Sequence, residues 1–426
     1  MQTFDWNFVH LTNQYFTVGQ TNIAWDAPVI HAFSNLAIIR ATRGATNIWW
    51  ERFGQHSSKA VASGCDDPLL ANLHLENEHG GSRRKGRTNI AISFKESADT
   101  LGQSSYHPLW KLRGYTTAAY AMVKADRAQY KELIIAYRHL AAEQLASVLQ
   151  DTAIPFDEAN HATYGLLHGS NDSVGPVAEL YLIVEDPLTN WNGTSLPHLA
   201  KGKASINLAW QARGMRYADF TEEGWVGFKS HLLEAETALE TAWELNTNDF
   251  RIPYEMMMVE LGQGKGRERM ELWFERTIRI SSYHYGAYIR KLNYLEPKWH
   301  GSFEEMIKFA REAMYVTNAD AKVMLLPVTA VEDILQYVPV EKRAEFWLRS
   351  GLFKDIQPAY ERFLKRYPDA SGWRHKYAVY AYKCQQWKVL KQQLDLIPKI
   401  DPEALGGAEE YRKMQKALLL HTTKRP

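Results

Sequence analysis

Residues 222–245 read EEGWVGFKSHLLEAETALETAWEL, and this stretch decides the fold class. Its apolar and small side chains recur at alternating intervals of three and four residues: Trp225, Phe228, Leu232, Ala235, Leu239 and Ala242. That spacing lines one side of an α-helix, because about 3.6 residues make one turn, whereas a half-buried strand would alternate with a period of about two. The stretch therefore predicts a long amphipathic helix with one buried side.

The same periodicity extends outward from this helix. RERMELWFERTIRI at 267–280 repeats it, and residues 130–150 are rich in Ala, Leu, Glu and Gln, which favour helices. At Asp66 or Asp67 a carboxylate precedes Pro68, which is typical of a helix start. Strand-length candidates are scarce: NIAIS at 89–93 and LYLIV at 180–184, of which the second could equally be a helical turn. The sequence therefore predicts an all-α fold.

Four stretches in the second half look alike when aligned on their first glutamate. ETAWELNTNDF, ERTIRISSYHY, EAMYVTNADAK and ERFLKRYPDAS start at 240, 275, 312 and 361, and the starts lie 35, 37 and 49 residues apart. Each reads as a helix end, a polar break and a new helix. A period near ~34 residues is that of tetratricopeptide hairpins, although bulky residues replace most small ones here. We expect an α-solenoid of degenerate tetratricopeptide-like helical hairpins, with a less regular helical bundle as the alternative.

Three regions are expected from the distribution of breaks. Residues 1–200 form an N-terminal helical region, with a long exposed loop at about 77–105 that is rich in Gly, Ser and charge. A break at 185–204 leads into signature helical repeats at 201–320. Tetratricopeptide-like repeats follow at 321–426.

Composition excludes several classes of function. Lys and Arg total 50 against 49 Asp and Glu, so a net charge of +1 gives no global attraction to nucleic acid or anionic membranes. Cys65 and Cys384 lie far apart, which suggests neither a disulfide framework nor a zinc site. No signal peptide or membrane span is expected. We expect a cytoplasmic protein without cofactors, and the oligomeric state stays open.

Several segments carry a family resemblance. AWQARGMRYADFTEEGWVGFKSHLLEAETALETAWELN, from residue 209, and YLEPKWHGSFEEM at 294–306 are its most specific parts; GCDDPLL at 64–70 and RYPDASGWRHKYAVYAYKC at 366–384 add to it. These residues resemble a group of bacterial proteins that share a domain of unknown function and are often grouped with tetratricopeptide proteins. The resemblance covers roughly 60–426. It implies an all-helical repeat fold and no particular activity.

The signature region also supplies the candidate binding residues. Arg213 and Arg216 in WQARGMRY could form ion pairs, with Glu222 or Glu223 near in sequence, or could face a groove. Tryptophans at helical spacing are either core between repeats or anchors for a peptide. We expect a binding groove with five members: Arg213, Arg216, Tyr217, Trp225 and Trp299.

The stretch at 294–306 reads mainly as a connector. Pro297 ends one helix, Ser302 is placed as an N-cap, and Glu305 stands three residues later, as in a capping box. The role of connector does not explain Trp299. Its side chain either packs into the neighbouring hairpin or offers an aromatic surface to a partner. His300 requires no function.

No catalytic residues are predicted. Residues 262–269, GQGKGRER, lack the spacing of a phosphate loop, and the basic run RRKGR at 83–87 is typical of a solvated loop. Two aspartates beside Cys65 should raise the pKa of its thiol. His161 and His168 lie seven residues apart, on one helix side but without a zinc-like spacing of three or four.

The sequence favours a non-enzymatic scaffold or adaptor whose concave face receives a protein or peptide partner. The alternative is an all-α, metal-assisted hydrolase that uses His161, His168 and nearby carboxylates such as Glu158 and Glu179. A nucleic-acid partner is less favoured than either. The identity of the partner stays open.

Overall fold

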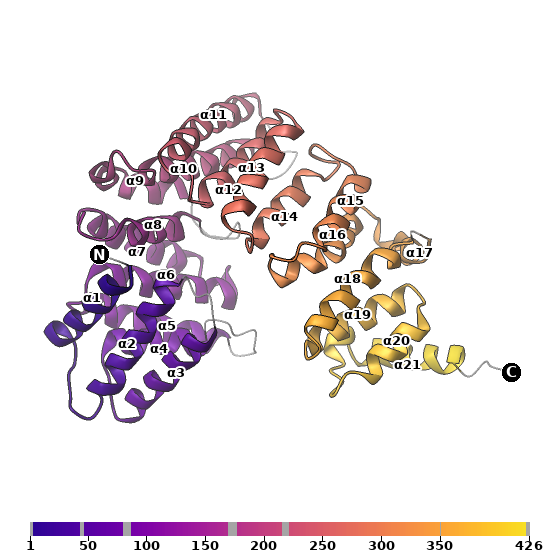
Figure 1. Ribbon diagram of the computed structural model, residues 1–426, viewed down its shortest axis with the longest axis horizontal. Helices are drawn as coiled ribbons and strands as arrows, with labels where there is room; N and C mark the ends of the chain where they lie inside the picture. Colours follow the sequence, from indigo (N-terminus) through magenta and orange to yellow (C-terminus); the bar gives the residue numbers. More distant parts are fainter. Residues whose placement is uncertain are drawn as a thin grey trace. The chain divides into compact units, whose positions relative to one another are not determined.

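The chain is helical throughout its described part. The computed structural model describes residues 3–42, 47–79, 87–168, 177–214, 221–349 and 351–422, and within these ranges every regular element is an α-helix or a short 3-10 helix (Figure 1). The expected all-α class is confirmed. The chain divides into two compact units, Met1–Thr247 and Asn248–Pro426.

In unit 1, each helix packs on the next helix along the chain, from α1 to α11. Its elements are α1 (Thr3–Val18), α2 (Asp26–Ala41), α3 (Asn47–Ala62), α4 (Pro68–His79), α5 (Arg87–Gln103), α6 (Pro108–Asp126), α7 (Lys131–Leu149), α8 (Phe156–His168), α9 (Val177–Leu188), η1 (Thr189–Trp191), α10 (Leu196–Arg213) and α11 (Glu222–Leu245). Such packing covers each apolar stripe with a sequence neighbour.

Unit 2 also consists of helices that pack on near neighbours in the chain, and its helices are shorter. Its elements are α12 (Arg251–Gln263), α13 (Arg267–Ile280), α14 (Tyr285–Tyr294), α15 (Phe303–Ala313), η3 (Ala321–Leu325), α16 (Leu326–Leu335), η4 (Val340–Lys342), α17 (Arg343–Arg349), α18 (Phe353–Arg366), α19 (Ser371–Lys383), α20 (Trp387–Asp395), η5 (Glu403–Leu405) and α21 (Ala408–Thr422). All four aligned stretches contain a helix end, since α11, α13, α15 and α18 end inside them.

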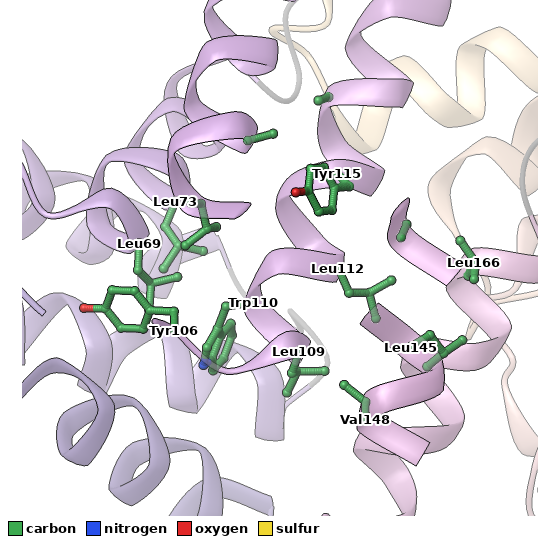
Figure 2. Packing of buried hydrophobic residues seen from close by; sticks show 14 of the residues in the cluster. Leu69, Leu73, Tyr106, Leu109, Trp110, Leu112, Tyr115, Leu145, Val148 and Leu166 are labelled. Atoms are coloured by element: carbon green, nitrogen blue, oxygen red, sulfur yellow. The ribbon is translucent and has the colours of Figure 1, made fainter. Parts of the chain in front are cut away.

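The core of unit 1 is built around α6. Trp110 is fully buried, and Figure 2 shows it between leucines of α4 on one side and Leu112 on the other. Leu145 and Val148 of α7 lie beyond Leu112 in the same view. A core of this kind is continuous from helix to helix, because each stripe contacts two neighbours.

Helices α10 and α11 are in close contact at two glycines. A Cβ on Gly202 would lie 2.6 Å from Cγ of Leu239, and a Cβ on Gly224 would lie 2.5 Å from the carbonyl oxygen of Ala212. The stripe predicted for 222–245 is buried from Phe228 to Ala242, as expected. Trp225 is the exception, with 41% of its surface exposed.

Two expectations about breaks differ from the structure. Most of the loop expected at 77–105 is helix α5, whose buried residues follow a spacing of three, four and three: Ala91, Phe94, Ala98 and Leu101. The polar residues between these four positions make the apolar spacing difficult to recognise in the sequence. The break expected at 185–204 is brief, because α10 already begins at Leu196 and its first turns are buried in the core of unit 1. The two units divide instead between Thr247 and Asn248. Both strand candidates lie in helices, α5 and α9.

Two predicted caps are confirmed. Ser302 Oγ accepts the backbone N–H of Glu305 at 3.2 Å and starts α15. Asp67 starts α4: its Oδ1 accepts the N–H groups of Leu69 and Leu70 at 3.1 and 2.9 Å. The fully buried Asp67 also holds distant parts of unit 1, because Oδ2 accepts Tyr106 O–H at 2.7 Å and the N–H of Gln20 at 3.0 Å.

Replacing Asp67 by Ala should lower the free energy of unfolding of unit 1 by about 2–4 kcal/mol. The substitution removes a helix cap and leaves the buried Tyr106 hydroxyl without its acceptor. Chemical denaturation followed by circular dichroism measures the change. Asp66→Ala is the matched control, because the neighbouring Asp66 is exposed. Equal losses for the two variants would contradict the structural role assigned to Asp67.

Candidate functional site

Arg213 lies at the centre of an aromatic cluster in unit 1. Its guanidinium carbon is 5.3 Å from the ring centre of Trp210, 5.8 Å from that of Trp225 and 5.9 Å from that of Phe228. Phe228 meets both tryptophans edge-on, at 5.2 and 5.6 Å between ring centres. The end of α10 and the start of α11 thus bring two predicted site residues, Arg213 and Trp225, together.

The electrostatics of this cluster follow from its partial burial. Removal from water lowers the pKa of Arg213, and the negative faces of the surrounding rings offset part of that cost for the cation. Glu222 and Glu223, expected as partners, lie in the exposed first turn of α11. Gly214 ends α10 with a φ of 79°, a conformation that favours glycine. Arg216 and Tyr217 lie outside the described residues.

Trp299 belongs to the other unit. It lies half-buried in the connector between α14 and α15, where its backbone N–H donates to the carbonyl oxygen of Glu296 at 2.9 Å. The neighbouring His300 donates from Nε2 to the carbonyl oxygen of Leu261 at 2.8 Å and covers Gly264 at the end of α12. The connector is therefore held to α12 by His300, a structural contact that the sequence did not reveal.

The two histidines of the enzyme alternative both lie on α8 but have different surroundings. His161 is exposed, whereas His168 stacks on Tyr164 with 4.7 Å between ring centres. Glu158 pairs with Arg40 and accepts from Asn7, and these contacts lower its pKa against the opposing effect of burial. Within the described ranges, no three His, Cys, Asp or Glu side chains come close enough to hold a metal ion.

Both cysteines are free thiols inside the two cores. Burial raises the pKa of Cys65 and of Cys384 to about 11. For Cys65, Asp66 and Asp67 add to the increase, as the sequence predicted, but burial is the larger cause. Neither thiol is therefore an activated nucleophile at neutral pH. The basic run at 83–87 lies outside the described residues except for Arg87, the first residue of α5.

Sequence reasoning missed a polar junction beneath the first helix. Asn7 is fully buried, and its Nδ2 donates to Oε1 of Glu158 at 2.8 Å although 151 positions separate the two residues. One turn further along α1, His10 lies between Trp6 and His107, at 4.5 and 4.7 Å between ring centres. The sequence does place polar residues on the same side of the helix as Trp6. An analysis of apolar periodicity alone assigns such polar residues to the solvent-exposed side.

Carboxylates gather beside α16 in unit 2. Glu296 is buried, and it accepts Tyr337 O–H at 2.6 Å and pairs with Lys298 at 2.9 Å. Asp333 lies near Glu296 and Glu332, and its pKa is raised to about 6, first by burial and then by these two charges. This carboxyl group therefore titrates close to neutral pH.

Replacing Asp333 by Asn should stabilise unit 2 at pH 8 by about 1 kcal/mol. A raised pKa in the folded state means that stability is fully present below about 3.8 and is lost as pH rises through about 6. The expected gain is reduced because the group is partly exposed and screened by solvent. It should vanish at pH 4 and below.

Denaturation curves at pH 4, 6 and 8 test this expectation. Asp369→Asn, at an exposed position of the same unit, should change stability little at any of these pH values. A loss of stability at pH 8 on replacing Asp333 would show that its charge is favourable instead.

No protein-family model matches the chain. The chain is 28% identical over 192 residues to a glutamate 5-kinase of Shouchella clausii (strain KSM-K16), an alignment that covers 42% of this chain and 46% of that protein. The chain thus spans less than half the length of the curated relative it matches. In the described ranges, no helix has the length and apolar character needed to cross a membrane.

Proposed function

We propose that this chain is a non-enzymatic helical-repeat scaffold that binds a protein or peptide partner, with Arg213 and Trp225 in the binding surface. The tetratricopeptide-like character of the array is part of this proposal. It is supported by the packing of each helix of unit 1 on the next, and by helix ends in all four aligned stretches. Helical hairpins that stack on their neighbours leave extended faces available for partners.

The main support for the proposal is the exposed edge of the aromatic cluster. Trp225 leaves 41% of its surface exposed although it stands in the apolar series of α11. Val226 and Leu233 on the same helix are 65% and 59% exposed. Tryptophan and arginine are the residues most enriched among those that dominate binding energies, because they combine a large apolar area with polar edges. The cluster is therefore the best candidate for an anchoring point.

The partner's chemistry follows from the cluster. An apolar or aromatic side chain fits against Trp225, and a nearby carboxylate or backbone carbonyl of the partner fits the Arg213 guanidinium. A protein or peptide segment offers both groups within a few residues. We also propose a cytoplasmic setting, on the sequence grounds given above.

Two enzymatic functions, a metal-assisted hydrolase and a kinase, are weaker candidates than a scaffold. The hydrolase alternative would need further ligands near His161 and His168, and the described residues do not bring three such groups together. Kinase activity belongs to the aligned relative, of which this chain covers less than half. A strand followed by a phosphate-binding loop and a helix would support nucleotide binding, and the described ranges contain no strand.

Replacing Trp225 by Ala should weaken partner capture at least tenfold while the fold is kept. An anchoring tryptophan typically contributes about 2 kcal/mol or more to binding, which corresponds to roughly 30-fold in affinity. The full chain serves as bait in a crosslinking pull-down, and crosslinked sites are mapped by mass spectrometry. We expect crosslinks within 205–247, the part of unit 1 that carries the cluster, and a loss of the partner with Trp225→Ala and with Arg213→Ala.

Tyr120→Ala provides a matched control. Tyr120 of α6 is 51% exposed, and the Lys124 ammonium lies 5.2 Å from its ring centre, so it is another exposed aromatic with a cation above it in the same unit. Its replacement should leave capture unchanged. Equal capture by wild type and Trp225→Ala would remove the cluster from the binding surface. Turnover in a hydrolase screen without any defined partner would overturn the scaffold proposal.

A further inference from the structure

The first helix docks on unit 1 through polar and aromatic contacts from three consecutive turns. Asn7 donates to Glu158 of α8, and His10 meets His107 at the start of α6. Gln14 Oε1 accepts the backbone N–H of His107 at 2.8 Å. Trp6 and Leu11 supply buried apolar area between these contacts. The docking of α1 therefore relies on polar and titratable side chains as well as on buried apolar area.

His10 stands where these contacts meet. Its ring stacks on Trp6, with an angle of 9° between the planes, and meets the His107 ring edge-on at 89°. The Trp110 ring centre lies 6.2 Å from that of His10. Its buried Nε2 atom has no hydrogen-bond partner within the described ranges. A proton added there would create a charged N–H donor with no acceptor in the junction, an arrangement that burial makes costly.

The charged groups around His10 come from four other elements. Arg40 of α2 and His107 at the start of α6 disfavour the imidazolium, whereas Asp151 after α7 and Glu158 of α8 favour it. Glu158 is already neutralised by its ion pair with Arg40. Burial is the largest influence, and together these effects lower the pKa of His10 to about 4. The pKa of His107 is lowered by burial as well.

We propose that α1 is a proton-sensitive latch, docked on α2, α6 and α8 while His10 is neutral and released when His10 gains a proton. Release exposes Glu158, Arg40 and the buried face of α6 that carries Trp110. In Figure 2 the indole nitrogen of Trp110 lies on the side of the ring away from Leu112, and it has no hydrogen-bond partner within the described ranges. This inference goes beyond the scaffold proposal and does not rest on it.

The direction and size of the effect follow from linkage. A histidine whose pKa is lower when docked stabilises docking fully above its free value of about 6.5, and that stability is lost as pH falls towards 4. Each pH unit in this window changes the docking equilibrium by about tenfold. Between pH 7.5 and pH 5, the population of released α1 should therefore rise roughly 30-fold.

Hydrogen exchange of the full chain at the two pH values tests the latch. Protection of the 3–18 amides, after correction for the intrinsic pH dependence of exchange, should fall roughly 30-fold at pH 5. Protection of the 87–103 helix in the same sample should stay unchanged, which separates local release from global unfolding. Equal protection of 3–18 at both pH values, or a parallel loss in both helices, would overturn the proposal.

Two substitutions at His10 should change the release of α1 in opposite directions. His10→Phe keeps a ring against Trp6 but cannot gain a proton, so the loss of protection of α1 at pH 5 should be much smaller than in the wild type. His10→Arg carries a permanent charge, so α1 should be released at pH 7.5 as well. His198→Phe is the matched control: His198 in α10 is also partly buried with a lowered pKa, and its replacement should preserve the wild-type pH response. A wild-type response from His10→Phe would refute the role of His10.

Discussion

Each helix of unit 1 buries apolar side chains against the next helix along the chain, and the rest of the unit depends on this contact. Helices of this length are marginal in water on their own, so the stripe-to-stripe contact supplies most of their stability. The pair α10 and α11 shows the constraint in its sharpest form, since Gly202 leaves only enough room for Leu239. A larger side chain there would separate the two helices. The aromatic cluster at the end of α10 depends on this close approach.

The first helix follows the rule only in part. It packs on α2, as its place in the chain requires, but polar groups on the same side connect it to α6 and α8. Hydrogen bonds and histidine rings respond to protons, whereas apolar contacts do not. Unit 1 therefore combines a largely apolar core with an N-terminal helix whose docking we propose to be sensitive to pH. The carboxylates beside α16 give unit 2 a titrating group near neutral pH.

Surface and core are distinguished within single helices. In α11 the apolar series begins at Trp225, yet burial begins only at Phe228, because Trp225 lies beside Arg213, the last residue of α10, whereas Phe228 packs on Trp210 almost one turn earlier in α10. Trp225 is left half-exposed beside Arg213 as a result. Trp273, at comparable spacing on α13, is buried at 4% exposure. Spacing identifies the side of a helix, but the length of the neighbouring helix determines how much of that side is covered.

The sequence alone determined the all-α class, the amphipathic stripe of α11 and the caps at Asp67 and Ser302, because each depends on residues within one or two turns. It did not disclose helix α5, whose short stripe at Ala91, Phe94, Ala98 and Leu101 is diluted by polar residues. Only the tertiary structure decided that Asn7 is buried against Glu158 and that Asp67 receives Tyr106. Those contacts join residues 151 and 39 positions apart, and local periodicity carries no information about which distant helix will meet a given side.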